Sequence, residues 1–223
     1  MKKNVLIQIL LQLMFLLTLI SCSENTTNEP KQVKNLEENI KNFTKKHVSI
    51  CKEIFNLLDK ENDLNFDNFP YSKLDASYNE KEFKIALAKT GMVKYEDIYN
   101  LLIRLNQNSN EFFVNNKQFT LLKPENRNTI ISDAIKLALI DNPLKFTSPN
   151  INSEALTAKM SCHETYLQDR EDCAEDALIN WGILASSCWF GTPAACAVGG
   201  VGVLAIAAVC SNRAKRDYAE CLN

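Results

Sequence analysis

Residues 162–221, CHETYLQDREDCAEDALINWGILASSCWFGTPAACAVGGVGVLAIAAVCSNRAKRDYAEC, decide the fold, because they hold six of the eight cysteines of the chain. A helix is expected over residues 153–190, where a serine suits the N-cap and one glycine is the only breaker. Gly191 suits the position just past that helix, and Pro193 suits the first turn of a second helix that would run to about residue 222. Two helices joined by so short a turn lie antiparallel as a hairpin.

The spacing of the cysteines predicts how the two helices pair. Facing residues in an antiparallel hairpin have numbers with a nearly constant total, and three cysteine pairs share a total of 383 or 384. The spacings of 11 and 15 residues on the first helix, and 14 and 11 on the second, are close to whole turns of about 3.6 residues. All six cysteines therefore lie on the contact faces. The predicted disulfides are Cys162–Cys221, Cys173–Cys210 and Cys188–Cys196.

A thiolate metal site is the main alternative to these disulfides. It is poorly supported, because the segment has no Cys-x2-Cys spacing and its one histidine is His163. His163 and Glu164 begin like the zinc-protease motif, but Leu167 stands where that motif requires its second histidine. We therefore predict no metal and no cofactor. The cysteine layout resembles the twin-cysteine helical hairpins of the mitochondrial intermembrane space, which have one residue fewer between cysteines; this is a resemblance of design and implies no shared function.

The first residues of the chain have the features of a bacterial export signal. Two lysines precede an apolar run over residues 5–20, and small residues follow it. This run is shorter than the roughly 20 apolar residues of a spanning helix, so an uncleaved membrane anchor is disfavoured. Leu19–Cys22, with the sequence LISC, resembles the lipobox of bacterial lipoproteins. The resemblance implies that Cys22 is acylated and becomes the first mature residue, and Ser23, in place of an aspartate, implies the outer membrane rather than the inner.

Removal of the signal defines the charge and organisation of the mature chain. Without residues 1–21, which hold two of the 25 basic residues, 202 residues remain, with 23 basic and 27 acidic side chains and a net charge of about -4. Nucleic acid is not an expected partner, since no basic face is indicated. Disulfides can form and persist in an exported protein. The predicted parts are a signal peptide over 1–21, a flexible tether over 22–31, an N-terminal helical region over 32–141 and the hairpin over 153–223, which can pack with the N-terminal region as one domain.

A heptad pattern predicts a helix over residues 33–57. Its core positions are Val33, Leu36, Ile40, Phe43, His47, Ile50, Ile54 and Leu57, and Val48, Cys51, Phe55 and Leu58 widen the stripe. A stripe of that width suits a bundle. Further helices are expected over 79–90, 94–106 and 124–140. For residues 107–123 the sequence leaves two alternatives, a short strand pair or a turn of helix. The predicted fold class is all-α, a helical bundle with a C-terminal antiparallel helical hairpin laddered by three disulfides.

Few residues of the chain suggest catalysis. His47 and Cys51 occupy positions of the heptad stripe, where packing is their usual role. The sequence contains no Gly-x-Ser-x-Gly nucleophile turn and no phosphate-binding loop, and we expect no enzyme activity. The acidic cluster over residues 169–176 is expected to pair across the hairpin with the basic residues over 213–216 instead of binding a cation. Those basic residues are Arg213, Lys215 and Arg216.

Residues 177–212 contain no Asp, Glu, Lys or Arg. They can be buried against the N-terminal helices, form an exposed patch for a protein partner, or enter a membrane. Trp181 and Trp189 are the candidate partner-binding residues. The favoured function is a lipid-anchored, non-catalytic binding or structural module of the bacterial cell envelope, held to a membrane by its lipid, with its oligomeric state open. The alternative is a membrane-active protein, since residues 177–212 resemble in composition the hydrophobic hairpins of pore-forming bacteriocins.

Overall fold

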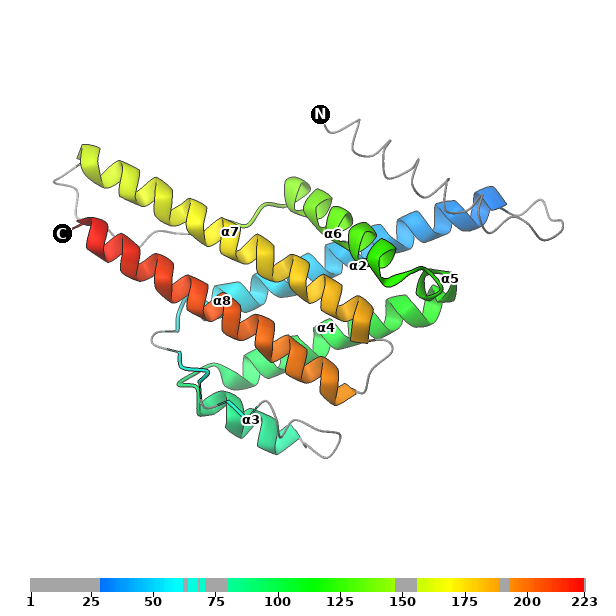
Figure 1. The fold of residues 1–223 in the computed structure, drawn as a ribbon, viewed down its shortest axis with the longest axis horizontal. Coiled ribbons are helices and arrows are strands. Elements are labelled where there is room, and N and C mark those ends of the chain that lie inside the picture. Colours follow the sequence, from blue (N-terminus) through cyan, green and yellow to red (C-terminus); the bar gives the residue numbers. More distant parts are fainter. Residues whose placement is uncertain are drawn as a thin grey trace. The chain divides into compact units, whose positions relative to one another are not determined.

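Helices are the regular elements that the structure describes. The computed structural model describes residues 29–61, 64–67, 69–70, 80–146, 156–188 and 193–222. Side chains are described over 35–61, 64–67, 69–70, 80–146, 161–185 and 200–222. The helices are α2 (Glu29–Leu58), α3 (Glu80–Ala88), α4 (Tyr95–Asn115), α5 (Lys117–Thr120), α6 (Pro124–Asp141), α7 (Leu156–Cys188) and α8 (Pro193–Leu222) (Figure 1). No strand occurs in the described residues, so the all-α prediction is confirmed for them.

Local signals in the sequence place several helix ends. The backbone after α3 turns at Gly91, whose φ of 88° is left-handed and therefore favours glycine. Pro124 opens α6, because its fixed φ suits the first turn and its missing N–H is not needed there. The helix α2 begins at Glu29, inside the segment predicted to be a tether, and ends at Leu58, one residue past the last predicted heptad position.

The helix α4 is longer than predicted because tertiary contacts hold its polar middle. Asn108 Nδ2 donates to the carbonyl oxygen of Phe43 at 3.1 Å, and Ser109 Oγ donates to a carbonyl of its own helix at 2.9 Å. Phe112, one turn further on, stacks on Phe43 with ring centroids 4.7 Å apart. Together with α5, this extension covers most of residues 107–123, so the strand-pair alternative for that segment is wrong.

The heptad stripe of α2 forms the core that the sequence predicts. Its residues from Ile40 onward belong to the compact unit Ile40–Asn223. Its buried members in this unit are Ile40, Phe43, His47, Val48, Ile50, Cys51, Ile54, Phe55 and Leu58. Phe43 packs on Phe112 and Phe113 of α4, and Phe55 packs on Trp181 of α7. The wide stripe is thus used by two neighbouring helices, as expected of a bundle.

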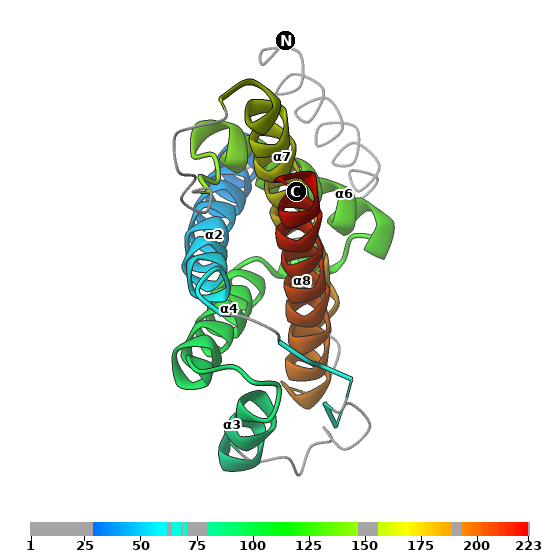
Figure 2. The ribbon, with the colours of Figure 1, turned by 90° about the vertical axis from the view of Figure 1, so that its left-hand side faces the viewer.

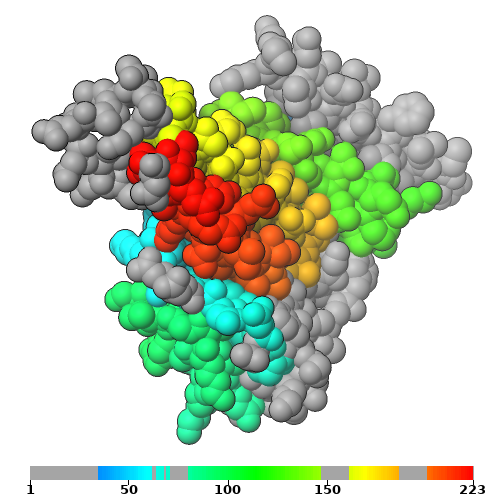
Figure 3. All heavy atoms as spheres, turned by 60° about the vertical axis from the view of Figure 1, so that its left-hand side comes forward, coloured from blue at the N-terminus to red at the C-terminus, as the bar shows by residue number. Residues whose placement is uncertain are grey.

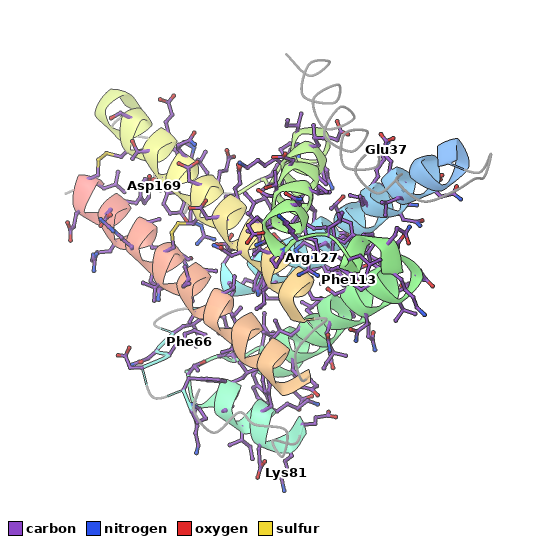
Figure 4. All side chains as sticks on the ribbon, turned by 45° about the vertical axis from the view of Figure 1, so that its right-hand side comes forward. Glu37, Phe66, Lys81, Phe113, Arg127 and Asp169 are labelled. Atoms are coloured by element: carbon purple, nitrogen blue, oxygen red, sulfur yellow. A yellow bond between two sulfur atoms is a disulfide. The ribbon has the colours of Figure 1, made fainter. Side chains whose placement is uncertain are left out.

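The helices α7 and α8 lie side by side and run in opposite directions (Figures 1 and 2). Disulfides join Cys162 to Cys221 and Cys173 to Cys210, with Cα–Cα distances of 5.9 and 6.0 Å (Figure 4). Two of the three predicted pairs are therefore present. The side chains of the third predicted pair, Cys188–Cys196, and the predicted turn at residues 191–192 lie outside the described residues.

The helix α6 approaches α7 closely at Gly182. A Cβ atom at this position would lie 2.3 Å from Cδ1 of Ile135 and 2.9 Å from Cγ2 of Ile131. Both isoleucines are fully buried on α6. The absence of a side chain at Gly182 therefore lets two isoleucines of α6 occupy the surface of α7, a contact that the sequence analysis did not assign to α6.

Candidate functional site

Trp181 lies in the core and does not form part of a binding surface. Its side chain is 3% exposed, and its Nε1 donates to the carbonyl oxygen of Gly200 on α8 at 3.0 Å. The ring of Phe55 meets the indole edge-on with centroids 6.0 Å apart. Trp181, predicted as a partner-binding residue, is therefore not accessible at the surface of this structure, because its side chain is buried and its indole N–H is hydrogen-bonded within the fold. Trp189, the second candidate, lies outside the described residues.

His47 and Cys51 are buried one turn apart on α2, where neither reaches solvent. His47 Nε2 lies 3.3 Å from the carbonyl oxygen of Leu178, so this nitrogen carries the hydrogen, and its Nδ1 is buried without a hydrogen-bond partner. Desolvation lowers the pKa of His47 to about 4, against a weaker opposing effect of that hydrogen bond, and burial raises the pKa of the Cys51 thiol. A neutral imidazole and a neutral thiol have packing roles, as the heptad analysis predicts.

Arg170 is a buried cation that connects α7 to two other parts of the fold. Its side chain is 2% exposed, and its guanidinium donates to the hydroxyl of Ser211 on α8 and to the carboxylate of Asp59 just after α2. The guanidinium carbon also lies 4.7 Å from the ring centre of Phe146. Burial lowers the pKa of Arg170 to about 10, so the group remains charged at neutral pH.

Sequence reasoning missed Arg170 because it stands within an acidic run. The helical spacing did carry a signal: Arg170 follows Tyr166 by four residues and precedes Cys173 by three and Ala177 by seven, so all four lie on one face. The rings of Tyr166 and Tyr218 meet across the pair between the two disulfides, with centroids 5.0 Å apart. A charged residue on a face defined by cysteines must be buried and paired.

Lys215 extends the connection made by Arg170. Its Nζ donates to the carbonyl oxygens of Asp59 at 3.2 Å and Glu61 at 3.0 Å. The carboxylate of Glu61 in turn accepts hydrogen bonds from the backbone N–H groups of Val93 and Lys94, at 3.0 and 2.7 Å, at the start of α4. The pair α7–α8 is thus tied by polar contacts to the segment that follows α2.

The contacts described for Arg213, Lys215 and Arg216 differ from the ion pairs predicted between α7 and α8. Arg213 and Arg216 each lie 3.6 Å from the carboxylate of Asp217 on their own helix, and Lys215 contacts backbone carbonyls. Within the acidic run, Asp172 accepts a hydrogen bond from Gln168 at 2.7 Å. Opposite positions on two antiparallel helices bring side chains together only on the contact face, and Glu171, Asp172, Glu175 and Asp176 are exposed. In the part of the chain that the structure describes, no group of three His, Cys, Asp or Glu side chains is placed to hold a metal ion.

A shallow groove lies between α3 and the start of α4. Its volume is about 750 Å³, and its lining residues are Glu80, Lys81, Lys84, Ile85, Ala88, Lys89, Tyr95 and Glu96. Lys84 pairs with Glu80 at 2.7 Å and lies over the ring of Tyr99 at 4.9 Å. The groove thus combines a small apolar floor with a rim of both signs. It provides contact area for a partner but no converging set of buried acid and base groups.

The uncharged stretch, residues 177–212, exposes apolar side chains on the outer face of α8. Ile206 and Val209 are each 61% exposed, on a helix that lies at the surface in Figure 3 (orange to red). They alternate with the buried residues Val203, Leu204, Ala207 and Ala208. Within the described parts of this stretch, residues 177–185 and 200–212, most side chains are buried, and Ile206 and Val209 leave one apolar face of α8 exposed.

Comparison with protein-family models, curated proteins and solved structures finds no match to this chain at the threshold of significance. Among the described helices, none has the length and apolar character needed to cross a bilayer.

Proposed function

We propose that this protein is a lipid-anchored, non-catalytic module of the bacterial cell envelope that acts by binding a partner. One observation carries the proposal: the described side chains that could take part in catalysis are buried in the core or already paired within the fold. His47 and Cys51 are buried and neutral, Arg170 is buried and paired, and four cysteines form disulfides. A fold that encloses its reactive groups and exposes mixed grooves is suited to recognition.

The anchor in this proposal comes from the sequence. Leu19–Cys22 matches the lipobox pattern, and Ser23 favours the outer membrane. The disulfides between Cys162 and Cys221, and between Cys173 and Cys210, fit an exported protein, because thiols in the cytosol are kept reduced. Acylation by two or more chains gives stable membrane attachment without a spanning helix.

The finer architecture is part of the same proposal. We infer that α7 and α8 form a closed hairpin with a third disulfide between Cys188 and Cys196. The two disulfides present have residue numbers with the same total, and extension of that register reaches Cys188 and Cys196 at the facing ends of the two helices. The turn between them would hold Gly191, which suits the end of a helix.

The membrane-active alternative requires the uncharged stretch to leave the core. Trp181, Leu178 and Leu204 are at most 3% exposed, and Gly182 is in close contact with α6. Freeing these residues would expose much of the apolar core, which favours the binding module. The chain without its lipid should therefore release no dye from vesicles and should show blue-shifted tryptophan emission before lipid is added.

Crosslinking in intact cells tests the proposal. A photoreactive amino acid in place of Ile85 in the α3–α4 groove should give discrete adducts with a protein partner, and the same label at Leu121, 85% exposed and outside the groove, serves as the control. Cys22→Ala should abolish acylation and leave the protein either unprocessed or released from the membrane. Equal labelling at both sites, or an unacylated mature N-terminus, would contradict the proposal.

A further inference from the structure

The outer face of α8 has the composition of a surface that meets a bilayer. Gly202, Ile206 and Val209 follow one another at spacings of four and three residues, which places them on one side of the helix. A Cβ atom on Gly202 would have no neighbour within 4 Å, so open space continues along this face. The charged residues of α8 all follow Asn212, so the first 20 residues of the helix could approach hydrocarbon without desolvating a charge.

Two arginines continue the same face toward the C-terminus. Arg213 and Arg216 follow Val209 by four and seven residues, and their side chains are 74% and 66% exposed. Each lies 3.6 Å from Asp217, a separation that leaves the guanidinium groups largely in solvent. An apolar half followed by exposed arginines matches the layers of a membrane surface, in which acyl chains lie below anionic headgroups.

We propose that this face of α8 docks onto the phospholipid surface to which the chain is anchored. This inference rests on the proposed lipid anchor at Cys22. Ile206 and Val209 would enter the boundary of the acyl chains, and Arg213 and Arg216 would contact lipid phosphates. The docking is peripheral, because the described helices include none that could span a bilayer and the opposite face of α8 is buried in the protein.

The anchor explains why so small a face suffices. Two aliphatic side chains and two arginines would bind a membrane only weakly on their own. Cys22 precedes α2 by seven residues, which can extend at most about 25 Å, and the helix from Glu29 to Ile40 adds about 17 Å, so the chain between Cys22 and Ile40 reaches at most about 42 Å. A tether of this length makes docking intramolecular, at an effective concentration of roughly millimolar order, which offsets a weak contact.

Lipid photocrosslinking of the full acylated protein tests the docking. The protein is reconstituted into vesicles of phosphatidylethanolamine and phosphatidylglycerol that contain a trace of phospholipid with a photoreactive acyl chain. Adducts mapped by mass spectrometry should concentrate on residues 202–209. The double variant Ile206→Asp with Val209→Asp should reduce them by about tenfold, whereas Leu121→Asp, at an exposed residue away from α8, should leave them unchanged.

The readouts separate this inference from the proposed function. Acylated protein that stays on vesicles but gives no adducts on α8 would overturn the docking and leave the anchor intact. Protein with no acyl group on Cys22 would overturn the anchor itself. A photoreactive amino acid in place of Ile206 reports protein neighbours: crosslinks from it between the α8 helices of two copies would assign the face to self-association and overturn the docking. Equal adduct yields with and without phosphatidylglycerol would overturn the role given to Arg213 and Arg216.

Discussion

The two ends of the helix pair α7–α8 are held together by different means. The charged end, over residues 161–176 and 210–222, has two disulfides, a small cluster around Tyr166 and Tyr218, and the buried Arg170. The uncharged end, over residues 177–185 and 200–209, packs its inner face on α6 and on the stripe of α2. In these described residues, covalent and ionic links stabilise the end where little apolar area is available, and apolar packing stabilises the end where that area is plentiful.

Removal of the outer disulfide should have the largest effect at the charged end. Cys162 and Cys221 are 59 residues apart, for which the chain-entropy model gives about 4 kcal/mol. The variant with both cysteines replaced by alanine should therefore lose most of that amount in chemical denaturation. Cys51, which is free and buried, is left unchanged in both proteins, so that the cross-link is the only difference between them. If the double variant were as stable as the parent, the charged end would not depend on its cross-link.

Asp59→Ala should have the next largest effect, because it leaves the buried charge of Arg170 without its carboxylate. Loss of one partner of a buried pair destabilises by roughly 3 kcal/mol. Glu53→Ala removes the pair with Arg104, whose side chains are 47% and 49% exposed, and should lose at most about 1 kcal/mol. The free energies of unfolding of the two variants measure the difference. Equal losses would mean that Arg170 does not act as a buried charge.

Acid should weaken the uncharged end through His47. Its pKa is about 4 in the folded protein and about 6.5 in the unfolded chain, so the unfolded state binds more protons between these values. The stabilising effect of the neutral imidazole is complete above pH 6.5 and is lost as the pH falls toward 4. Between pH 7 and pH 5 this loss should be about 2 kcal/mol. His47→Leu should flatten the pH dependence of unfolding in this window, and an unchanged slope would contradict the burial of His47.

Alanine substitutions at two glycines should have the smallest effects and opposite signs. Alanine at Gly182 gains about 1 kcal/mol of helix propensity but meets Ile131 and Ile135, and overpacking of roughly 1–3 kcal/mol should make the variant less stable. Alanine at Gly202 meets nothing within 4 Å and should be more stable by up to about 1 kcal/mol. Thermal unfolding of the two variants compares the inner and outer faces directly. Stabilisation by both would mean that α6 does not approach α7 closely.

The sequence predicted the pairing of α7 and α8 better than it predicted their surroundings. Periodicity carried the first result, because the cysteines and the heptad residues such as Phe43 repeat at helical spacing. The contact of α6 with Gly182 was missed, since the sequence does not show whether another helix packs against a glycine within a helix. The buried Arg170 and Asn108 were missed for a related reason: their partners, Asp59 and Phe43, are distant in the chain, and composition assigns polar residues to the surface.

Peptide mapping of the membrane-extracted protein without reduction tests the central claim most directly, because one measurement reports the anchor and the cross-links together. We expect a mature N-terminus at acylated Cys22 and a free thiol at Cys51. The expected linked peptides are Cys162–Cys221, Cys173–Cys210 and Cys188–Cys196. A disulfide that includes Cys51, any other pairing of the six, or an unmodified N-terminus at another residue would contradict this account.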